Sequence, residues 1–550
     1  MKQLTKTDFI LYRECSNNVW VKWHKPKEYK KFPISDFEKS LGVSGNEVEE
    51  LARGMFPKGY LIERRSEGAR ELTKELVAKK TPIIFQAVFS TDKYLAATDI
   101  LQWNEKADAY DLYEVKMSST EEDSDDEEDL EDKSKEAGNG TKKTKPKKVN
   151  KKRELQYEYD LAFQANVLHL CGIKIHDKFL IRLNKNYVRL GPLDFSENQL
   201  FIKENKTKDI EKLMPRALVE TEQAYKYLSR TEMPEKPCPC YYNGRSSHCT
   251  TFTHINPEVP PYSVHDLNRI GNSKKYLREL LDRGILEIDK VPEHEIPKPK
   301  KAKEGEKPSK PRKLNQVRVH KSREPIIDLP SIKRELDSLT FPLYFLDYET
   351  NPTAIPPFNQ YRPYQHIVFQ YSLHVLTEKD AKNNLKPQHF ECLLLDGDPA
   401  ERIVESLRAR IGDTGNVISW YKKFENSRNR ELAFSVPEHS KFLRGVIDRT
   451  YDLMDIVENQ YYVHHEFHGR SSIKSVLPAL FPNDESLSYK SLGVKNGTEA
   501  IGAYRQITHG ELLGESAEKK KREMLKYCEI DTYAMYKLWK FFTELVNSSV

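Results

Sequence analysis

The chain has 550 residues, 38% hydrophobic and 31% charged, so at about 150 residues per domain it can form three or four folded units. No apolar run reaches the ~18 residues of a membrane-spanning helix, and residues 1–20 lack a secretory signal, so we expect a cytoplasmic protein without membrane contact. The 89 basic and 84 acidic residues leave a formal charge of only +5, which decides little about partners.

The N-terminal part has the pattern of an α/β domain, which we place at residues 1–260. Three β-rich runs are separated by turn-prone residues, at 83–90, 94–101 and 109–116. A helical pattern over 157–172 and a strand over 178–184 follow. This order of strands and helices favours one α/β core.

Charged segments interrupt and follow this domain. Residues 117–153 join an acidic block to a basic block, and we expect a disordered insert within the domain. Residues 261–295 carry two short helical patterns and a probable strand, which suggests a small helical adaptor. Residues 296–324 are rich in Pro and Lys, as in a flexible linker.

The C-terminal domain, at 325–550, begins with strands and ends with a long helix. Strands are predicted at 342–350, 366–376, 391–396 and 416–421, and helices at 399–411 and from Glu515 onward. We expect a mixed sheet covered by helices.

Asp99, Glu114 and Lys116 form the first candidate site. Residues two apart on a strand share a face, so Glu114 and Lys116 can approach one metal ion while Asp99 comes from the neighbouring strand. Carboxylates that converge on Mg²⁺ or Mn²⁺ beside a water-activating group suit phosphodiester hydrolysis. The alternative is a surface ion-pair face, because an E-x-K triplet is common by chance in a chain so rich in Glu and Lys.

This arrangement resembles the RecB-type PD-(D/E)XK nucleases, in which an Asp and E-x-K on consecutive strands are followed by a helix with Gln or Tyr. The resemblance implies a restriction-endonuclease-like fold, metal binding by Asp99 and Glu114, catalysis by Glu114 and Lys116, and nucleic-acid binding by Gln164, or Tyr159 in its place. Glu49 stands where that family often has a histidine ligand.

Four of the seven cysteines bracket the N-terminal domain and could hold a metal, namely Cys15, Cys238, Cys240 and Cys249. Four thiolates suit either iron–sulfur or zinc, and unligated thiols are the alternative. Some RecB-like and AddB-like nucleases carry a 4Fe–4S cluster on cysteines in these places, so the resemblance implies such a cluster here. Cys171, Cys392 and Cys528 lie in apolar patterns and are interpreted as packing residues.

Asp347 and Glu349 begin the second candidate site. Two acids on one face at the end of an apolar strand repel each other unless a cation lies between them. Tyr527 and Asp531 are four residues apart on the last helix and therefore share its face. An exposed Asp beside a packed Tyr is the alternative interpretation of this pair.

Together these residues resemble the DEDD exonucleases of the RNase H-like superfamily, in the DnaQ-type variant with tyrosine. The resemblance implies that Asp347, Glu349, Glu425 and Asp531 bind two metal ions, with Asp452 in reserve for Glu425. Asp347, Glu349 and Tyr527 would be catalytic, and Tyr527 would orient the attacking water. The histidine-rich segment 461–472 (YYVHHEFHGRSS) is expected to form a substrate-facing loop. Arg470, Ser472 and Lys474, in and just after this segment, are its expected nucleic-acid-binding residues.

The whole chain resembles a bacterial family that fuses a RecB-like nuclease to a DnaQ-like exonuclease. The resemblance implies a metal-dependent nuclease that acts on DNA in repair or defence, including 3′–5′ exonuclease activity, with Mg²⁺ or Mn²⁺ as cofactors and other repair or defence proteins as partners. The alternatives are an RNA 3′ exonuclease and a nucleic-acid-binding scaffold with inactive centres.

Overall fold

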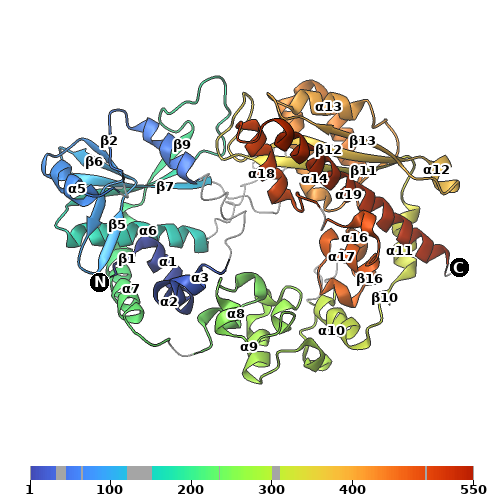
Figure 1. Cartoon of the computed structure of the whole chain (residues 1–550), viewed down its shortest axis with the longest axis horizontal. Helices are drawn as coiled ribbons and strands as arrows, with labels where there is room; N and C mark the ends of the chain where they lie inside the picture. Colours follow the sequence, from blue (N-terminus) through green and yellow to red (C-terminus); the bar gives the residue numbers. More distant parts are fainter. Residues whose placement is uncertain are drawn as a thin grey trace, which may run out of the picture. The chain divides into compact units, whose positions relative to one another are not determined.

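The computed structural model describes residues 2–32, 45–63, 66–119, 151–233, 236–299, 310–489 and 492–548. The chain is a mixed α/β protein and forms two compact units (Figure 1). Unit 1 comprises 1–240, 249–256 and 353–365, and unit 2 comprises 241–248, 257–352 and 366–550. Apart from residues 241–248, the chain stays in unit 1 up to Asn256, close to the expected boundary at 260, and a later piece of the expected C-terminal domain also belongs to unit 1.

Unit 1 is built on a six-stranded sheet in which β7 lies antiparallel to β6 and parallel to β8. The strands in sheet order are β2 (Tyr60–Leu61), β3 (Ile83–Phe85), β6 (Ile100–Asn104), β7 (Ala109–Ser119), β8 (Ile175–Leu183) and β9 (Phe201–Asn205). A smaller sheet holds β1 (Leu4–Thr5), β5 (Tyr94–Ala97) and β4 (Val88–Ser90). The helices are α1 (Lys6–Glu14), α2 (Ser16–His24), α3 (Pro26–Tyr29), one over 45–52, α5 (Ala69–Ala78), α6 (Lys151–Leu170), α7 (Thr207–Leu228) and α8 (Phe252–Ile255).

The run 83–90, expected as one strand, is divided between the two sheets of unit 1. Gln86 has a positive φ of 56° and lies between β3 and β4. A left-handed residue turns the chain out of the extended conformation, so the apolar run continues in another sheet. The expected charged insert joins β7 to α6, and its residues 120–150 lie outside the described part of the chain.

The segment 353–365 belongs to unit 1, although both of its neighbours in sequence belong to unit 2. Arg189 Nη1 donates hydrogen bonds to the carbonyl oxygens of Pro356 (3.0 Å) and Pro357 (2.7 Å), and the backbones of Arg189 and Gln360 are hydrogen-bonded at 2.9 Å. Ala354 packs into a core cluster of unit 1. The expected continuous domain at 325–550 is therefore interrupted in the structure.

Unit 2 contains a five-stranded mixed sheet in which β11 lies antiparallel to β12 and parallel to β14. Its strands in sheet order are β13 (Gln388–Leu393), β12 (His366–Leu376), β11 (Leu343–Pro352), β14 (Asn416–Ser419) and β15 (Thr450–Asp452), and β10 (Ile326–Ile327) pairs separately with β16 (Tyr462–Val463). The helices are α9 (Lys274–Asp282), α10 (Arg312–Ser322), α11 (Leu329–Asp337), α12 (Glu378–Lys382), α13 (Ala400–Arg408), α14 (Lys422–Ser435), α15 (Ser440–Asp448), α16 (Asp455–Glu458), α17 (Ile473–Leu480), α18 (Gly497–Thr508) and α19 (Gly514–Asn547).

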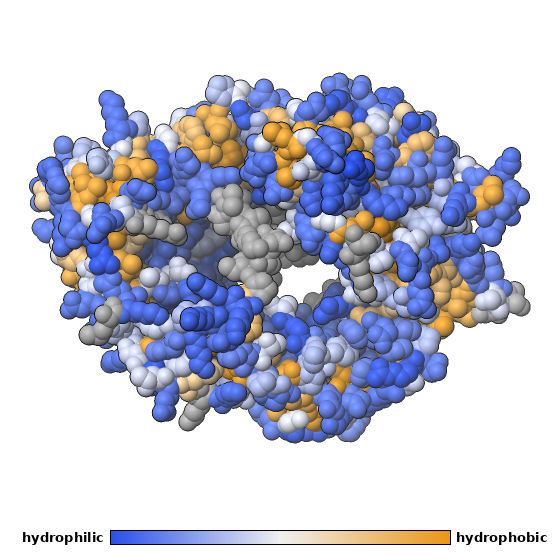
Figure 2. Space-filling view, viewed as in Figure 1, coloured by the Kyte–Doolittle hydropathy of each residue, from blue (hydrophilic) through white to orange (hydrophobic). Residues whose placement is uncertain are grey.

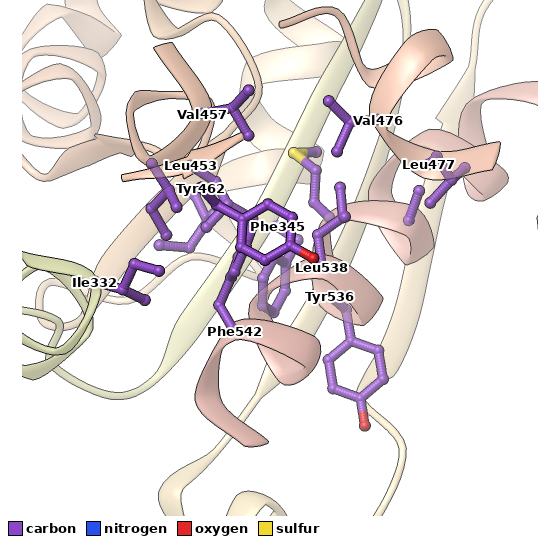
Figure 3. Close-up of a cluster of buried hydrophobic side chains, with 14 of the residues drawn as sticks. Ile332, Phe345, Leu453, Val457, Tyr462, Val476, Leu477, Tyr536, Leu538 and Phe542 are labelled. Carbon is purple, nitrogen blue, oxygen red and sulfur yellow. The ribbon is translucent and has the colours of Figure 1, made fainter. Parts of the chain in front are cut away.

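Alternation along β11 places its side chains in two cores. Phe345 packs with Leu538 and Phe542 of α19, which lies against β11 and β12 (Figures 1 and 3). Leu346 packs in the other core, with residues of α13 and α14. Each buried side chain of this size contributes roughly 1.5–3 kcal/mol. Because residues two apart share a face, Asp347 follows Phe345 on the α19 side of the sheet.

The expected adaptor and the end of the expected linker are packed parts of unit 2. The adaptor contains α9, but the predicted strand after it is absent from the described residues 283–291, which include only the 3₁₀-helix Ile288–Lys290. Within 296–324, residues 300–309 are outside the described part, whereas 312–322 form α10. Leu314 and Val317 of α10 pack into the apolar cluster of α9, so this part is no flexible linker.

Figure 2 shows one face of the molecule, on which hydrophilic residues predominate and hydrophobic residues form separate patches. This distribution agrees with a chain in which 31% of the residues are charged. Among the described residues, none of the helices is both long and apolar enough to span a bilayer.

Candidate functional site

The first acidic centre lies in unit 1 where β6 and β7 pair. Glu114 and Lys116 alternate on β7 and therefore share a face, and Asp99 immediately precedes β6. Asp99 Oδ2 accepts a 2.8 Å hydrogen bond from the backbone N–H of Val115. The side chain of Asp99 is thus held against the backbone between Glu114 and Lys116.

Glu114 is buried among polar partners. Its Oε1 accepts hydrogen bonds from Lys116 Nζ (2.7 Å) and Lys6 Nζ (2.5 Å), and its Oε2 accepts one from Gln164 Nε2 (2.6 Å). Burial acts to raise the pKa of Glu114, but the charges and hydrogen bonds of Lys116 and Lys6 outweigh it and hold that pKa well below its usual range. Glu114 is therefore ionised and already compensated by protein cations.

Asp99 differs electrostatically from Glu114. Burial, followed by the negative charge of Glu114, raises the pKa of Asp99 to about 7, although Lys6 acts in the opposite direction. The charge of Glu49 raises it further, which places Glu49 near this centre. Glu49 lies on the helix over 45–52 and accepts a hydrogen bond from Gln86 Nε2 (2.5 Å). The left-handed turn at Gln86 thus contributes a side chain to the site.

Helix α6 brings Gln164 rather than Tyr159 to this centre. Gln164 is fully buried and donates a hydrogen bond to Glu114, whereas the hydroxyl of Tyr159 donates to Glu220 (2.9 Å). Asp160, one turn before Gln164, forms an ion pair with Lys116. Sequence reasoning did not identify Asp160, although its position on the same helix face as Gln164 could have indicated it.

The four expected cysteines converge in unit 1. The sulfur atoms of Cys15, Cys238, Cys240 and Cys249 all lie within 4.8 Å of one another. Cys238 Sγ and Cys240 Sγ are 3.2 Å apart, and Cys240 Sγ is 3.9 Å from Cys15 Sγ. Four thiols at this spacing can bind a metal ion.

The second acidic centre lies in unit 2, on the face of β11 that α19 covers. Glu349, Glu425 and Asp531 are buried, and Asp347 is partly buried. Glu425 belongs to the first turn of α14, and its buried Oε2 has no hydrogen-bond partner among the described residues. Cys528 Sγ lies 3.6 Å from Asp347 Oδ2, so α19 presents both a thiol and a carboxylate here.

Burial raises the pKa values of all four acids, and neighbouring negative charges raise three of them further. Burial, followed by the charge of Asp531, raises the pKa of Asp347 well above its usual value. Burial and the charge of Asp347 do the same for Glu349 and Glu425. Burial also raises the pKa of Asp531 to about 6, against hydrogen bonds from two tyrosines and the charge of Lys474. Such a group of buried carboxylates is stabilised by divalent cations.

Tyr527 lies beside Asp531 and Lys474. The charge of Asp531 acts on its hydroxyl group, and Lys474 Nζ lies 5.5 Å from the centre of its ring. Burial and then the charge of Asp531 raise the pKa of Tyr527 far above its usual value. Tyr527 therefore keeps its proton at neutral pH and can orient a water molecule, but it cannot serve as a base.

Asp452, the reserve ligand, has a structural role. Its Oδ1 accepts hydrogen bonds from the backbone N–H groups of Tyr421 (2.9 Å) and Met454 (3.2 Å), and its Oδ2 accepts one from Lys422 N (2.8 Å). Asp452 thus holds the chain at the start of α14. This leaves Glu425 as the acid from this region whose pKa the charge of Asp347 raises.

Of the three residues of unit 2 expected to bind nucleic acid, Lys474 acts on the second centre, because its charge opposes the raised pKa values of three acids there. Ser472 Oγ is hydrogen-bonded to Ser475 Oγ (3.1 Å). The side chain of Arg470 is 62% exposed and lies 3.8 Å from Asp266. Phe467, in the preceding histidine-rich segment, is buried.

Three further residues of these centres escaped sequence reasoning. Lys6 and Tyr489 had no sequence signal, because each approaches its partner from a distant segment. Cys528 lies in an apolar pattern typical of packing residues, yet it is three residues before Asp531, and helical periodicity places such residues on one face.

One family comparison gives a match. A family described as a domain of unknown function (DUF2779) matches residues 344–472. The match includes Asp347, Glu349 and Glu425 but ends before Lys474, Tyr527 and Asp531. No curated protein and no solved structure matches this chain. The matched region therefore covers part of unit 2 together with the segment 353–365 of unit 1, and the family carries no statement about activity.

Proposed function

We propose that this protein is a metal-dependent nuclease that hydrolyses phosphodiester bonds of DNA and removes nucleotides from 3′ ends at its second centre. The observation that carries the proposal is the set of four acids in unit 2, Asp347, Glu349, Glu425 and Asp531. Burial raises the pKa values of all four, and the charges of neighbouring acids raise those of Asp347, Glu349 and Glu425 further. A protein gains nothing in stability from such a group unless cations compensate it.

The donors fit the proposed cofactors. Mg²⁺ and Mn²⁺ prefer oxygen ligands, and the four acids offer only carboxylate oxygens. One of these, Oε2 of Glu425, has no hydrogen-bond partner in the part of the chain that the structure describes. Bound cations would supply the positive charge that activates water and stabilises the leaving 3′-oxygen. Tyr527 would orient the water through its hydroxyl, and the ammonium group of Lys474 would attract the phosphate.

The first centre supports a second nuclease activity or a binding role. Asp99, Glu114 and Glu49 would hold the cation, Lys116 would face the scissile phosphate, and Gln164 would fix Glu114. The specific observation in favour of binding without cleavage is that Lys6 and Lys116 both occupy Oε1 of Glu114, where a cation would have to compete with them.

We further propose that the four cysteines hold a structural metal. The resemblance implies a 4Fe–4S cluster, in which each thiolate binds a different iron and the sulfurs must lie far apart. A single tetrahedral ion with Zn–S bonds of about 2.3 Å places its sulfurs about 3.8 Å apart. The observed distances of 3.2 and 3.9 Å support the single ion. Metal analysis decides, because one zinc per chain supports this proposal and four irons in brown protein contradict it.

Cleavage of end-labelled single-stranded DNA in Mg²⁺ or Mn²⁺ tests the nuclease proposal. Asp347→Asn should lower the rate at least about 100-fold, because loss of an outer-shell partner alone costs 10–100-fold in metal sites. Asp337→Asn on α11, whose side chain is 61% exposed, is the matched control and should retain activity. Equal rates for wild type and Asp347→Asn would refute catalysis at this centre.

Two companion experiments separate the remaining alternatives. Glu114→Gln, with the exposed Glu75→Gln as its control, reports on the first centre. RNA of the same sequence, labelled in the same way, distinguishes an RNA exonuclease from a DNA nuclease. If wild type bound DNA but neither wild type nor any variant cleaved it, the result would support the nucleic-acid-binding scaffold with inactive centres.

A further inference from the structure

Two carboxylates and a thiol meet in the second centre. One carboxylate oxygen each of Asp347 and Glu349 and the thiol of Cys528 lie within 4.8 Å of one another. Cys528 Sγ is 3.6 Å from Oδ2 and 3.9 Å from the carbonyl oxygen of Asp347. Because Cys528 is fully buried on α19, its sulfur is held at the carboxylates rather than in solvent.

This set of donors distinguishes between classes of cation. Mg²⁺ binds oxygen and seldom sulfur, whereas Zn²⁺ and Cd²⁺ bind thiolate strongly and also accept carboxylates. Asp347 and Glu349 would belong to both sets of ligands. A thiophilic ion and a pair of oxygen-bound ions therefore cannot use these two acids at the same time.

We infer that Cys528 makes the second centre a site for a thiophilic divalent cation of the zinc class, bound by Cys528 Sγ, Asp347 and Glu349 in competition with Mg²⁺ or Mn²⁺. As the metal–sulfur bond forms, the thiol releases its proton to solvent. The binding stands on the geometry alone, and only its consequence, reversible inhibition of DNA cleavage by zinc, rests on the proposed function.

A separate observation provides a further donor at the same place. Glu425 Oε2 is buried and lacks a hydrogen-bond partner among the described residues, and after burial the largest influence on its ionisation is the charge of Asp347. Zinc sites are usually four-coordinate. Cys528, Asp347 and Glu349 supply three ligands, and the fourth would come from Glu425 or from water.

The first experiment measures release of Mn²⁺ from the full-length protein during titration with Zn²⁺, by electron paramagnetic resonance of free Mn²⁺. Wild type, Cys528→Ser and Cys392→Ser are compared, because Cys392 is a partly buried cysteine in another core of unit 2. Cys528→Ser should need at least about tenfold more Zn²⁺ for half release, as expected for loss of a ligand. The same Zn²⁺ concentration for all three proteins would overturn the inference.

The second experiment uses wild type alone and stays informative if Cys528→Ser fails to fold. Co²⁺ replaces zinc and gives a thiolate charge-transfer band, to which the four-cysteine cluster of unit 1 also contributes. Excess Mn²⁺ should remove the part of the band that arises at Cys528, because Mn²⁺ competes for carboxylates and not for a site made of thiolates alone. A band that is insensitive to Mn²⁺ contradicts the inference.

Neither experiment requires nuclease activity. A protein that cleaves no DNA but shows competition dependent on Cys528 would refute the proposed function and support this inference. A protein that cleaves DNA and is inhibited by the same Zn²⁺ concentration with or without Cys528 would support the proposed function and refute this inference.

Discussion

The hydroxyl of Tyr489 donates a 2.6 Å hydrogen bond to Oδ1 of Asp531 on α19. The ring of Tyr489 also lies 5.6 Å from that of Tyr527, so two phenols flank one carboxylate. A hydrogen bond to one carboxylate oxygen fixes the orientation of the group and leaves the other oxygen for a cation. Tyr489 is therefore a positioning residue for the second centre.

Tyr489→Phe should weaken cation binding about 10- to 100-fold, the usual cost of losing an outer-shell partner. The measurement is the Mn²⁺ concentration that gives half-maximal DNA cleavage, together with direct Mn²⁺ binding. High Mn²⁺ should restore much of the rate, because Asp531 itself remains. Tyr533→Phe, on α19 like Asp531, is the control and should leave the Mn²⁺ requirement unchanged. A rate that stays low at saturating Mn²⁺ would argue against a positioning role.

A buried histidine should make unit 2 sensitive to acid. Burial, and then the neighbouring His389, lowers the pKa of His374 from 6.5 to about 3, while Lys526 acts in the same direction. His374 Nδ1 is hydrogen-bonded to Thr532 Oγ1 (2.8 Å). Because the folded-state pKa is depressed, the stabilisation is present above pH 6.5 and is lost as the pH falls toward 3. At pH 5 the loss from this group is about 2 kcal/mol.

His374→Asn tests this sensitivity, because asparagine can place a polar atom where Nδ1 lies. The free energy of unfolding should change less between pH 7 and pH 5 in the variant, by about 2 kcal/mol. His294→Gln is the control, since the side chain of His294 is 83% exposed. If the free energy of unfolding changed between pH 7 and pH 5 as much in His374→Asn as in wild type, His374 would take up its proton without destabilising the fold.

Arg189 should anchor the segment 353–365 to the rest of unit 1. Its guanidinium group donates to the carbonyl oxygens of Pro356, Pro357 and Gly191. Because hydrogen bonds from charged donors are worth about 1.5–3 kcal/mol each, Arg189→Ala should destabilise unit 1 by at least about 2 kcal/mol. Amide hydrogen exchange should rise within 353–365. Arg216→Ala, at a 72% exposed side chain, should change neither quantity.

Much of the fold could be predicted, because apolar strands carry a clear pattern. The range 366–376, predicted from its apolar run, is β12 in the structure, and Asp347 and Glu349 lie on the same face of the preceding strand, as alternation requires. The closing helix begins at Gly514, one residue from the expected start. These elements follow from local patterns of burial that the sequence displays directly.

Other features depend on contacts that no local pattern reveals. The run 83–90 has the composition of one strand, and only the turn at Gln86 divides it between sheets. The end of the linker was judged by its Lys and Pro content, which concealed Leu314 and Val317 at helical spacing. Lys6 contacts Glu114 although the two are 108 residues apart in sequence, and no spacing rule connects them.

Any side chain at Gly469 should destabilise unit 2, because its Cβ atom would collide with Gln316. Gly469 has a φ of +72°, and a Cβ atom there would lie 2.4 Å from Gln316 Cδ. Gln316 cannot easily move, because its amide group contacts Tyr262, Asn268 and two backbone carbonyls. Gly469→Ala should therefore cost more than the ~1–2 kcal/mol of a left-handed alanine.

Gly510→Ala is the matched control for this prediction. Gly510 has a similar φ of +74°, but a Cβ atom added there would have no neighbouring atom within 4 Å, so this variant measures backbone strain alone. Chemical denaturation of both variants gives the comparison. Equal destabilisation by the two substitutions would mean that Gln316 yields to the methyl group and that its contacts contribute little to stability.

Lys6 should act as an internal competitor for the cation of the first centre. Its ammonium group lies 2.5 Å from Glu114 Oε1 and lowers the pKa of that carboxyl. Lys6→Met removes the charge but retains much of the apolar stem, so the pKa of Glu114 should rise and the metal-free protein should lose about 1–3 kcal/mol. The freed oxygen should then bind Mn²⁺ more tightly, and Mn²⁺ should raise the melting temperature of Lys6→Met more than that of wild type.

Lys79→Met, at an exposed pair with Glu75, provides the control. A smaller Mn²⁺-induced shift in Lys6→Met than in wild type would mean that Lys6 orients Glu114 for the cation instead of competing with it.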